Sequence, residues 1–272
     1  MSIYRVGVIG WPIEHSLSPV MHNAAFAALG MADWQYDRMA IPPDVLGHSI
    51  KELRNHDFVG INVTVPHKEA VMRYVQADNL AQVVGAINTI DFRTGVGTNT
   101  DVSGFLDDLA AHGVTIKGAR VVVLGAGGAA RAVVYGLAQG GAEVAVVNRS
   151  LERALDLART LLVPFRLMTL NEASDWGASL IVNCTSAGLQ PNVSVTPWHE
   201  DVPFPKGVTL YDTIYRPART SLMRQAEAAS GQAINGTGML VRQGAAAFKL
   251  WTGVEAPVEV MMDALLDALG GL

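Results

Sequence analysis

Three polar segments in the first half of the sequence carry side chains suited to chemistry. The segments are His15–Pro19, Asn62–Lys68, and Asn88–Thr89 together with Asn99–Asp101. They follow expected strands, and ligands of open α/β sheets usually bind at the ends of strands. Together they supply hydroxyls, amides, one carboxylate and one lysine, which suits a small polyhydroxylated acid. Taken singly, each residue also has a plainer interpretation: Ser18 as a helix cap, Lys68 as a solvated lysine, or Asn62 as a partner of loop backbone.

A glycine-rich turn between an apolar strand and a helix predicts a dinucleotide site. Arg120–Leu124 runs directly into Gly125–Ala130, which matches the pattern G-x-G-x-x-A. The first glycine permits the tight turn, the second lets the backbone approach a pyrophosphate, and the small third residue allows close helix packing. The helix N-terminus then offers free N–H groups to the phosphates. Because the motif is short, a purely structural turn is the alternative.

The next expected strand ends in a basic segment that favours NADP over NAD. A site for NAD usually has an acidic residue about 20 positions after the glycine turn, where it binds the ribose hydroxyl. This sequence instead has Asn148, Arg149 and Ser150, with Arg153 one helical turn later. Two guanidinium groups can bind a 2'-phosphate through charge-assisted hydrogen bonds. Alternatively, both arginines are solvated surface charges.

The composition excludes several classes of protein. The net charge of -5 and the absence of Lys or Arg runs give no reason to expect nucleic acid as a partner. No apolar stretch is long enough to span a membrane, and we interpret Val6–Ile13 as a buried strand rather than a signal sequence. A single cysteine, Cys184, forms neither an intramolecular disulfide nor a structural zinc site. We therefore expect no metal, a reducing compartment and a cytoplasmic location.

Alternating apolar runs and amphipathic stretches predict an α/β fold with parallel sheets. At 272 residues, two domains are more plausible than one. The expected strands are Arg5–Ile9, Phe58–Val65, Ala86–Phe92, Arg120–Leu124, Glu143–Val147, Leu180–Asn183 and Val208–Asp212. Ser18 and Pro19 are expected to cap and start a helix that reaches Leu29. We expect residues 191–205 to form an irregular loop and residues 239–269 to be wholly helical.

The order of the motifs resembles the shikimate dehydrogenase family over nearly the whole chain. The matching segments are His15–Pro19, Asn62–Lys68, Gly85–Thr89, Asn99–Asp101, Gly125–Arg131, Asn148–Arg149, Asn183–Ser186, Asp212–Pro217 and Gly238–Gln243. The resemblance implies reversible, NADPH-dependent reduction of 3-dehydroshikimate to shikimate, a step towards chorismate and the aromatic amino acids. It also implies a substrate domain of residues 1–103 plus 238–272, to which the C-terminal helices return. Residues 104–237 are then a doubly wound, Rossmann-type NADP domain.

The resemblance assigns roles to residues at the matching positions. Lys68 and Asp101 are implied as the catalytic pair. The implied substrate ligands are Ser16, Ser18 and Tyr215 for a carboxylate, and Asn62, Thr64, Asn88 and Gln243 for ring hydroxyls. The implied cofactor contacts are Gly125, Ala126, Gly127, Gly128, Ala129, Asn148, Arg149, Ser150, Arg153, Thr185, Ser186, Thr213, Gly236 and Met239. The expected partner is a small molecule, and the expected state is a monomer or homodimer.

The chemistry of the implied pair depends on the charge of Lys68. A lysine is ordinarily an ammonium near neutral pH, and a neighbouring carboxylate stabilises that charge further. An ammonium donates a proton to a developing alkoxide and stabilises it electrostatically. We therefore expect Lys68 to transfer the proton and Asp101 to position it and a substrate hydroxyl. Two alternatives stay open at this point: a quinate/shikimate or aminoshikimate dehydrogenase of the same family, and a catalytically silent NADP-binding regulatory module.

Overall fold

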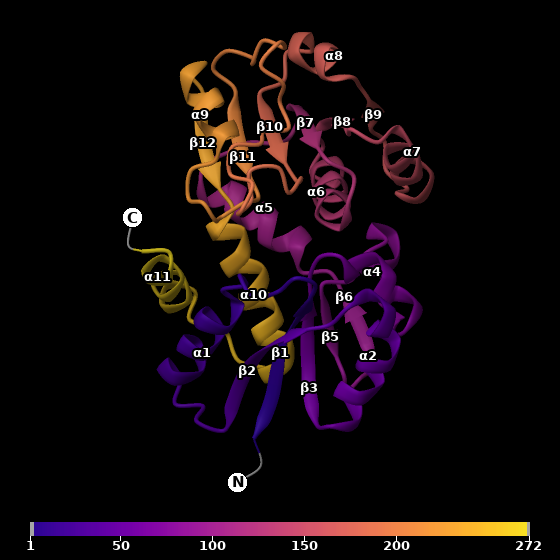
Figure 1. Cartoon of the computed structure of the whole chain (residues 1–272), viewed down its shortest axis with the longest axis vertical. Helices are drawn as coiled ribbons and strands as arrows, with labels where there is room; N and C mark the ends of the chain where they lie inside the picture. The colour runs from indigo at the N-terminus through magenta and orange to yellow at the C-terminus, as the bar shows by residue number, and fades with distance from the viewer. Residues whose placement is uncertain (1–2, 271–272) are drawn as a thin grey trace. The chain divides into compact units, whose positions relative to one another are not determined.

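The computed structural model of the protein describes residues 3–270, which form two α/β units (Figure 1). The first unit contains the residues up to Gly104 and those from Leu240 onward, and the second is Phe105–Met239. The chain passes between the units inside two helices, α5 (Asp101–Ala111) and α10 (Thr237–Thr252). The first boundary lies one residue later than the sequence led us to expect, and the second boundary lies two residues later.

The first unit is built on a mixed sheet of six strands in the order β2-β1-β3-β5-β6-β4. The strands are β1 (Tyr4–Gly10), β2 (Trp34–Ala40), β3 (Phe58–Val63), β4 (Gln76–Ala77), β5 (Thr89–Asp91) and β6 (Val96–Thr98). β1 pairs in parallel with β2 and β3, whereas β5 is antiparallel to both β3 and β6. This register places Asn62 opposite Thr89, so the polar ends of two strands meet.

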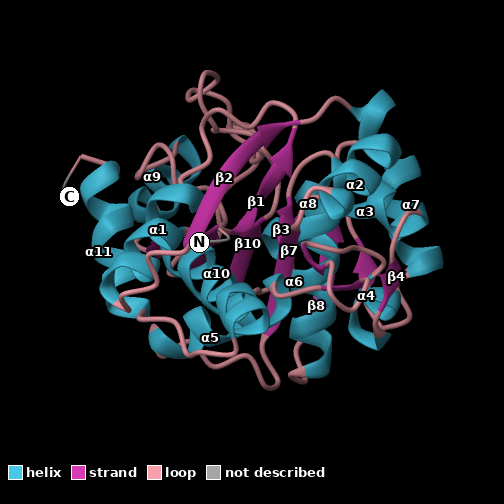
Figure 2. Cartoon of the chain, turned by 90° about the horizontal axis from the view of Figure 1, so that it is seen from below, coloured by secondary structure: helices cyan, strands magenta, loops and turns pink. Residues whose placement is uncertain are grey.

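Helices cover both faces of the first sheet (Figures 1 and 2). The helices are α1 (Ser18–Ala28), α10 and α11 (Val258–Ala268) on one side, and α2 (Leu46–Asn55) and α3 (His67–Ala70) on the other, with α4 (Asn79–Val84) near β6. Two short 3-10 turns lie at Pro43–Val45 and Val71–Arg73. Val6 and Val8 of β1 pack into the cluster shared with α10, while Ile9 packs into the opposite cluster. β1 is therefore buried on both faces.

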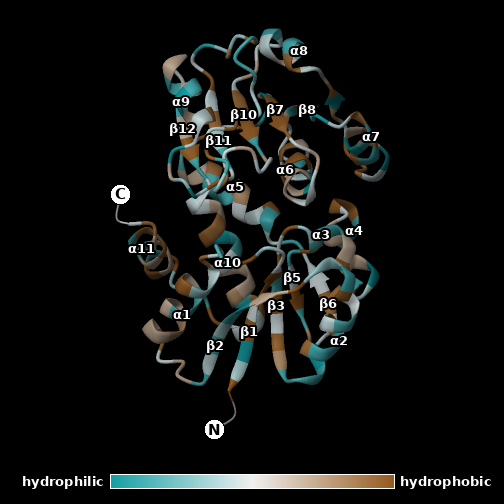
Figure 3. Cartoon of the chain, viewed as in Figure 1, coloured by the Kyte–Doolittle hydropathy of each residue, from teal (hydrophilic) through white to brown (hydrophobic). Residues whose placement is uncertain are grey.

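The second unit is a parallel sheet of six strands in the order β12-β11-β10-β7-β8-β9. The strands are β7 (Arg120–Leu124), β8 (Glu143–Val147), β9 (Arg166–Leu167), β10 (Leu180–Asn183), β11 (Thr209–Asp212) and β12 (Gln232–Asn235). The helices are α6 (Gly128–Gln139), α7 (Leu151–Thr160), α8 (Leu170–Asp175) and α9 (Ser221–Ala228). The chain winds to one side of β7 and then to the other, which is the doubly wound pattern. β7 and β10 are strongly hydrophobic in Figure 3, as buried parallel strands are.

The α/β class expected from the sequence is confirmed, but several local expectations were wrong. Ser18 is the first residue of α1 rather than its cap, and no side chain caps that helix. The physical reason is that the helix begins one residue earlier, because the backbone oxygen of Leu17 already accepts from the N–H groups of Val20 and Met21. The tail is two helices, not one, because Gly253 adopts a positive φ of 74° and Pro257 precedes α11.

Strand lengths also differ from expectation. β3 ends two residues early, and the stretch expected from Ala86 to Phe92 forms a strand only at Thr89–Asp91. The backbone of Asn88 still bonds to Val63 and Thr98, but the N–H of Ile87 donates to the backbone oxygen of Lys68 in α3, so the ladder goes no further. In the part of the chain that the structure describes, no helix has both the length and the apolar character needed to cross a membrane.

Candidate active site

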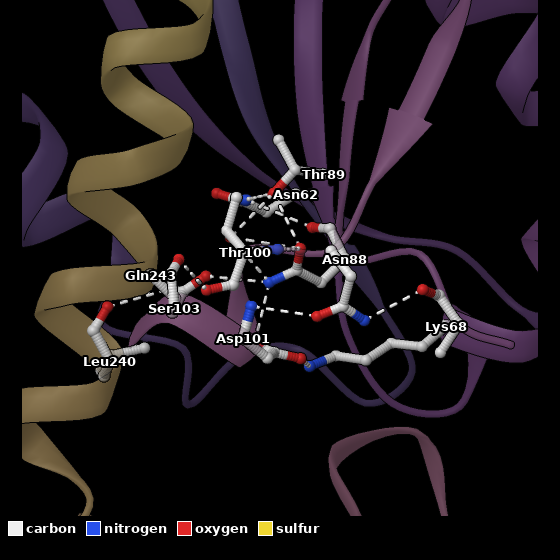
Figure 4. Close-up of polar contacts among 11 residues, drawn as sticks. Asn62, Lys68, Asn88, Thr89, Thr100, Asp101, Ser103, Leu240 and Gln243 are labelled. Carbon is white, nitrogen blue, oxygen red and sulfur yellow. Dashed lines mark hydrogen bonds and ion pairs between the residues drawn. The ribbon is translucent and has the colours of Figure 1, made fainter. Parts of the chain in front are cut away.

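An ion pair between Lys68 and Asp101 lies at one edge of the polar site of the first unit (Figure 4). Lys68 Nζ lies 2.6 Å from Asp101 Oδ2, and the two side chains are only 14% and 5% exposed. Lys68 is held by α3, a helix fixed by the buried ring of His67, whose Nε2 donates to the backbone oxygen of Ile41 at 2.7 Å. The ammonium is therefore held in one place by a short, largely buried contact.

Asn88 holds the second oxygen of that carboxylate. Its Nδ2 donates to Asp101 Oδ1 at 2.8 Å and to Thr100 Oγ1 at 2.9 Å. Its Oδ1 accepts from the backbone N–H of Thr100 at 2.7 Å. Both carboxylate oxygens are thus bound by donors, which fixes the orientation of the Asp101 side chain.

Gln243 reaches the same network from α10, far along the sequence. Gln243 Oε1 lies 3.3 Å from Asn88 Nδ2, and Gln243 Nε2 donates to the backbone oxygen of Leu240 at 2.8 Å. Gly104 makes this approach possible because it has no side chain. A Cβ at this position would lie only 2.7 Å from the backbone nitrogen of Gln243. The C-terminal helix α10 therefore returns to the site, as the sequence resemblance implied.

Asn62 joins the network from β3. Asn62 Nδ2 donates to Thr89 Oγ1 at 3.0 Å and to the backbone oxygen of Asn88 at 3.2 Å. Asn62 Oδ1 accepts from the hydroxyl of Tyr36 at 2.7 Å. We call this set the Asn88 network. It consists of Asn62, Lys68, Asn88, Thr89, Thr100, Asp101 and Gln243.

The other expected substrate ligands lie around the start of α1, after β3, or in the second unit. Ser16 is half-buried, and its Oγ accepts from the backbone N–H of Ser18 at 3.4 Å. Ser18 is buried, and Thr64 is half-buried just after β3. Tyr215 belongs to the second unit, where it follows β11 and is half-buried.

The glycine turn of the second unit has the geometry that a pyrophosphate requires. Gly125 adopts a φ of 114°, a conformation that other residues rarely adopt, and a Cβ there would meet Cys184 at 3.2 Å. A Cβ at Gly127 would meet no atom within 4 Å, so internal packing does not explain that glycine. Close approach of a ligand does explain it. Helix α6 begins beside it with no side-chain cap, which leaves its first N–H groups for an anion.

A pocket of about 890 Å³ in the second unit adjoins this turn. Its walls include Leu124, Val147 and Thr185, which lie at the carboxyl ends of β7, β8 and β10. Crevices at this edge of a doubly wound sheet are where nucleotides bind. Asn148, Arg149 and Ser186 also line the pocket, whereas Arg153 is exposed on α7 and does not line it. The residues present therefore fit a dinucleotide with a phosphorylated ribose.

The remaining expected cofactor residues lie at the same end of the second sheet or cap its helices. Ser150 caps α7 by accepting from the Arg153 N–H at 3.4 Å. The backbone N–H of Thr213 donates to the oxygen of Asn183 at 3.0 Å, and Gly236 packs against Thr213 so closely that a Cβ would clash. Met239 is buried at the end of the unit.

A buried carboxyl group supports this edge of the second sheet. Asp212 is fully buried and accepts from Asn183 Nδ2 at 2.9 Å and from Thr220 Oγ1 at 2.7 Å. Burial raises the pKa of Asp212, and the hydrogen bonds oppose that shift. The group holds two loops together and lies outside the pocket walls.

Sequence reasoning missed several residues of both sites. Tyr36, which binds Asn62, was not expected at the site. Thr89 and Thr100 lie in the expected polar segments without an assigned role, and both belong to the Asn88 network. Thr169, Asn192, Thr196 and His199 line the pocket of the second unit, although no motif marks them. Across residues 3–270, no group of three His, Cys, Asp or Glu side chains is arranged to hold a metal ion.

Comparison with known proteins identifies close relatives across the whole chain. The NADP+-dependent shikimate dehydrogenase of Methanocella arvoryzae is 43% identical over 280 residues, covering 99% of this chain and 100% of the relative. The same enzyme of Symbiobacterium thermophilum is 44% identical, covering 98% and 95%. The crystal structure of shikimate 5-dehydrogenase from Thermus thermophilus with NADP(H) and shikimate superposes with a TM-score of 0.88 at 39% identity, covering 98% and 100%.

Family models match three consecutive parts of the chain. The shikimate dehydrogenase substrate binding domain matches residues 8–90, the shikimate / quinate 5-dehydrogenase family matches residues 108–191, and the shikimate 5'-dehydrogenase C-terminal domain matches residues 236–266. The matches follow the order of the two units, with the substrate-binding match in the first and the nucleotide turn in the second. On these grounds the chain belongs to the shikimate dehydrogenase family.

Proposed function

We propose that this protein interconverts 3-dehydroshikimate and shikimate with NADP(H), and that Lys68 and Asp101 carry the proton transfer. The observation that carries the residue assignment is the 2.6 Å contact between Lys68 Nζ and a carboxylate whose other oxygen is bound by Asn88. A fixed ammonium beside small polar side chains is suited to a carbonyl that becomes an alcohol.

Lys68 acts as the acid in the reductive direction. NADPH, when bound, supplies the hydride that the carbonyl carbon receives. The Lys68 ammonium stabilises the negative charge that develops on the carbonyl oxygen and gives that oxygen a proton. Lys68 is then neutral and regains a proton from solvent, while the contact with Asp101 keeps the amine in place. In the oxidative direction, microscopic reversibility requires neutral Lys68 to accept the hydroxyl proton.

Small hydroxyl and amide side chains orient the substrate. Ser16 and Ser18 donate to its carboxylate, and Tyr215 is assigned to the same group. Asn62, Thr64, Asn88 and Gln243 are assigned to the ring hydroxyls. Asn62 and Gln243 support this assignment because they join the network that fixes the proton donor.

The second unit holds the cofactor in this proposal. The backbone of Gly125–Ala129 receives the pyrophosphate, and Arg149 receives the 2'-phosphate. Asn148, Ser150, Thr185 and Ser186 complete the nucleotide side. Arg153, Thr213, Gly236 and Met239 are retained as expected cofactor contacts. Arg149 carries the cofactor choice, since it lines the pocket where a NAD site would have a carboxylate.

Substitution of the catalytic pair tests the proposal. Lys68→Ala is expected to lower kcat by about 10²- to 10⁴-fold, the usual contribution of a positioned acid. Asp101→Asn is expected to lower kcat less, because Lys68 remains in place. Lys51→Ala, an exposed lysine of α2, is the matched control and should behave as wild type. If Lys68→Ala kept wild-type kcat while Asp101→Asn abolished turnover, the two roles would have to be exchanged.

The alternative to an enzyme is a catalytically silent NADP-binding regulatory module. One experiment distinguishes the two. Binding of NADP+ without any shikimate-dependent formation of NADPH would support the rival. The intact Lys68–Asp101 pair favours an enzyme. A cytoplasmic location and a monomeric or homodimeric state stay predictions.

A further inference from the structure

The amide of Asn62 has both of its donor hydrogens occupied by the protein. Asn62 Nδ2 donates to the backbone oxygen of Asn88 at 3.2 Å and to Thr89 Oγ1 at 3.0 Å. A backbone oxygen can only accept, so the NH₂ side of the amide must face Asn88. The single Thr89 proton is directed to Asn88 Oδ1 at 3.0 Å, which leaves Thr89 Oγ1 to accept from Asn62. Asn62 therefore has no hydrogen left for a ligand.

The oxygen of the same amide is only partly occupied. Asn62 Oδ1 accepts from the hydroxyl of Tyr36 at 2.7 Å, and within residues 3–270 it has no other hydrogen-bond partner. An amide oxygen has two lone pairs, so one of them remains. Asn62 lies near the end of β3 and is 5% exposed. A ligand can therefore meet this side chain only by donating a hydrogen to its oxygen.

Tyr36 is a fixed and permanent donor to that oxygen. Its side chain lies on β2, is 2% exposed, and stacks on His22 with ring centroids 4.2 Å apart and planes at 10°. Trp251 packs nearby, with its ring centroid 6.2 Å from that of Tyr36. Burial raises the pKa of Tyr36 well above its ordinary value of 10, so the phenol keeps its proton. The hydroxyl therefore holds the Asn62 amide in one orientation.

Lys68 offers the opposite polarity at the other end of the same network. The hydrogen bonds run from Asn62 through Thr89, Asn88 and Asp101 to Lys68 (Figure 4). An ammonium has three hydrogens and no lone pair, so it can only donate. The contact with Asp101 uses one hydrogen and leaves two for a ligand. A carbonyl oxygen can only accept, so it fits Lys68 but does not fit Asn62.

We propose that Tyr36 is a positioning residue that, through Asn62, makes the site select a hydroxyl at a ring position that does not react. That hydroxyl keeps its hydrogen in both directions of the reaction and can always donate to Asn62 Oδ1. A carbonyl, or any other group that only accepts, is rejected at this position. The selection favours the ring orientation that places the reacting carbonyl at Lys68. The inference rests on the proposed function, in which Asn62 and Lys68 both contact the substrate.

Analogues of shikimate test the polarity of Asn62. The Kd values of shikimate and of its 4-deoxy, 5-deoxy, 4-fluoro and 5-fluoro analogues are measured with the full chain and with Asn62→Ala. The hydroxyl that contacts Asn62 is the one whose removal weakens binding to the wild type, by about tenfold, but not to Asn62→Ala. Fluorine cannot donate, so the fluoro analogue at that position should bind no more tightly than the deoxy analogue.

Tyr36→Phe tests the positioning role, because it keeps the stacked ring and removes only the hydroxyl. We expect the Kd of shikimate to rise by about threefold or more, whereas the Kd of the deoxy analogue at the Asn62 position should not change. A merely structural role of Tyr36 would weaken the binding of both ligands equally. Tyr74→Phe is the matched control, since Tyr74 is exposed in the first unit and does not belong to the Asn88 network. If Asn62→Ala does not fold, the loss of the Tyr36→Phe effect identifies the hydroxyl instead.

The possible outcomes separate the inference from the proposed function. A fluoro analogue that binds as tightly as shikimate would show that Asn62 donates, and it overturns the inference alone. Equal weakening of shikimate and the deoxy analogue by Tyr36→Phe overturns the positioning role of Tyr36. A Kd of shikimate that is unchanged in Asn62→Ala overturns the substrate role of Asn62, and the inference with it. Absence of shikimate binding to the wild type overturns the proposed function itself.

Discussion

The two units build their polar sites in opposite ways. In the first unit, buried side chains bind one another: Asn88 and Asp101 are 2% and 3% exposed, and Thr89 is fully buried. In the second unit, the glycine turn follows Leu124, which lines a pocket with apolar walls and an exposed arginine. The first site therefore has a geometry fixed by its own hydrogen bonds, whereas the second offers a ligand the uncapped backbone N–H groups at the start of α6.

This difference predicts how the two units respond to substitution. In the Asn88 network, each side chain satisfies a buried neighbour, so its loss should cost stability and activity together. In the second unit, Arg149 at the pocket is exposed, so its loss should change cofactor binding alone. The following experiments test this contrast.

Lowering the pH should destabilise the first unit through His22 and stabilise the second unit through Asp212. This is the largest effect that we expect. The folded pKa of His22, about 3, lies below its ordinary value of 6.5, so the unfolded chain binds the proton more readily. Stability should fall as the pH drops from about 6.5 towards 3, by up to about 5 kcal/mol, because each unit of pKa is worth about 1.4 kcal/mol. His22→Phe, followed by urea unfolding across this range, should flatten the pH dependence.

Asp212 supplies the opposite case in the second unit. Burial raises its pKa, so the folded state binds the proton more readily, and this contribution is lost as the pH rises through the folded pKa. Asp212→Asn should therefore remove a stabilisation that the wild type gains in acid. An unchanged pH dependence in both variants would contradict the contrast between the two interiors.

Asn88→Ala should give the next largest effect. The variant leaves Asp101 Oδ1 and the Thr100 N–H without the Asn88 partner, at a cost of about 3 kcal/mol. Because the carboxylate also positions Lys68, kcat should fall by about 100-fold or more. Thermal unfolding and steady-state kinetics measure both effects. A loss of activity with an unchanged Tm would show that the network contributes little to folding.

Arg149→Ala should change cofactor choice without changing stability. Loss of a charge-assisted contact to a phosphate is expected to lower kcat/KM for NADP+ by about 10- to 100-fold and to leave the value for NAD+ unchanged. Arg153→Ala is the matched control, since Arg153 is exposed and does not line the pocket. An equal loss in both variants would contradict the leading role of Arg149.

Two glycines of the same turn should separate folding from binding, with the smallest expected effect. Gly125→Ala places a Cβ in a positive-φ conformation against Cys184 and should destabilise the protein by about 1–3 kcal/mol. Gly127→Ala meets no atom and should fold normally, but its Cβ would obstruct the pyrophosphate and weaken NADP+ binding. Calorimetry with NADP+ and thermal unfolding distinguish the two variants. Normal NADP+ affinity in Gly127→Ala would show that the ligand does not approach there.

The sequence predicted the second unit better than the first. β7, β8 and β10 have the expected bounds, because strands buried on both faces read as uninterrupted apolar runs. β2 was missed, since it is an edge strand that carries Asp37 and Arg38 among alternating exposed residues. Such a pattern resembles a polar connection as much as a strand.

Some residues of the candidate site were likewise indicated by the sequence, and others were not. Lys68 and Asp101 lie in polar segments that were candidates from the sequence, and the family resemblance implied that they form a pair. The structure places them 2.6 Å apart. Tyr36 was missed because it stands alone in a strand, and its partner Asn62 is reached only through the sheet. Spatial neighbours that are distant in sequence leave no local pattern to detect.

Steady-state kinetics with shikimate and quinate, each with NADP+ and NAD+, test the central claim most directly. The account predicts that shikimate with NADP+ gives the highest kcat/KM. This value should exceed that of either substrate with NAD+, which has no 2'-phosphate, by about tenfold or more. A higher kcat/KM for quinate with NAD+ would contradict both the proposed substrate and the role of Arg149.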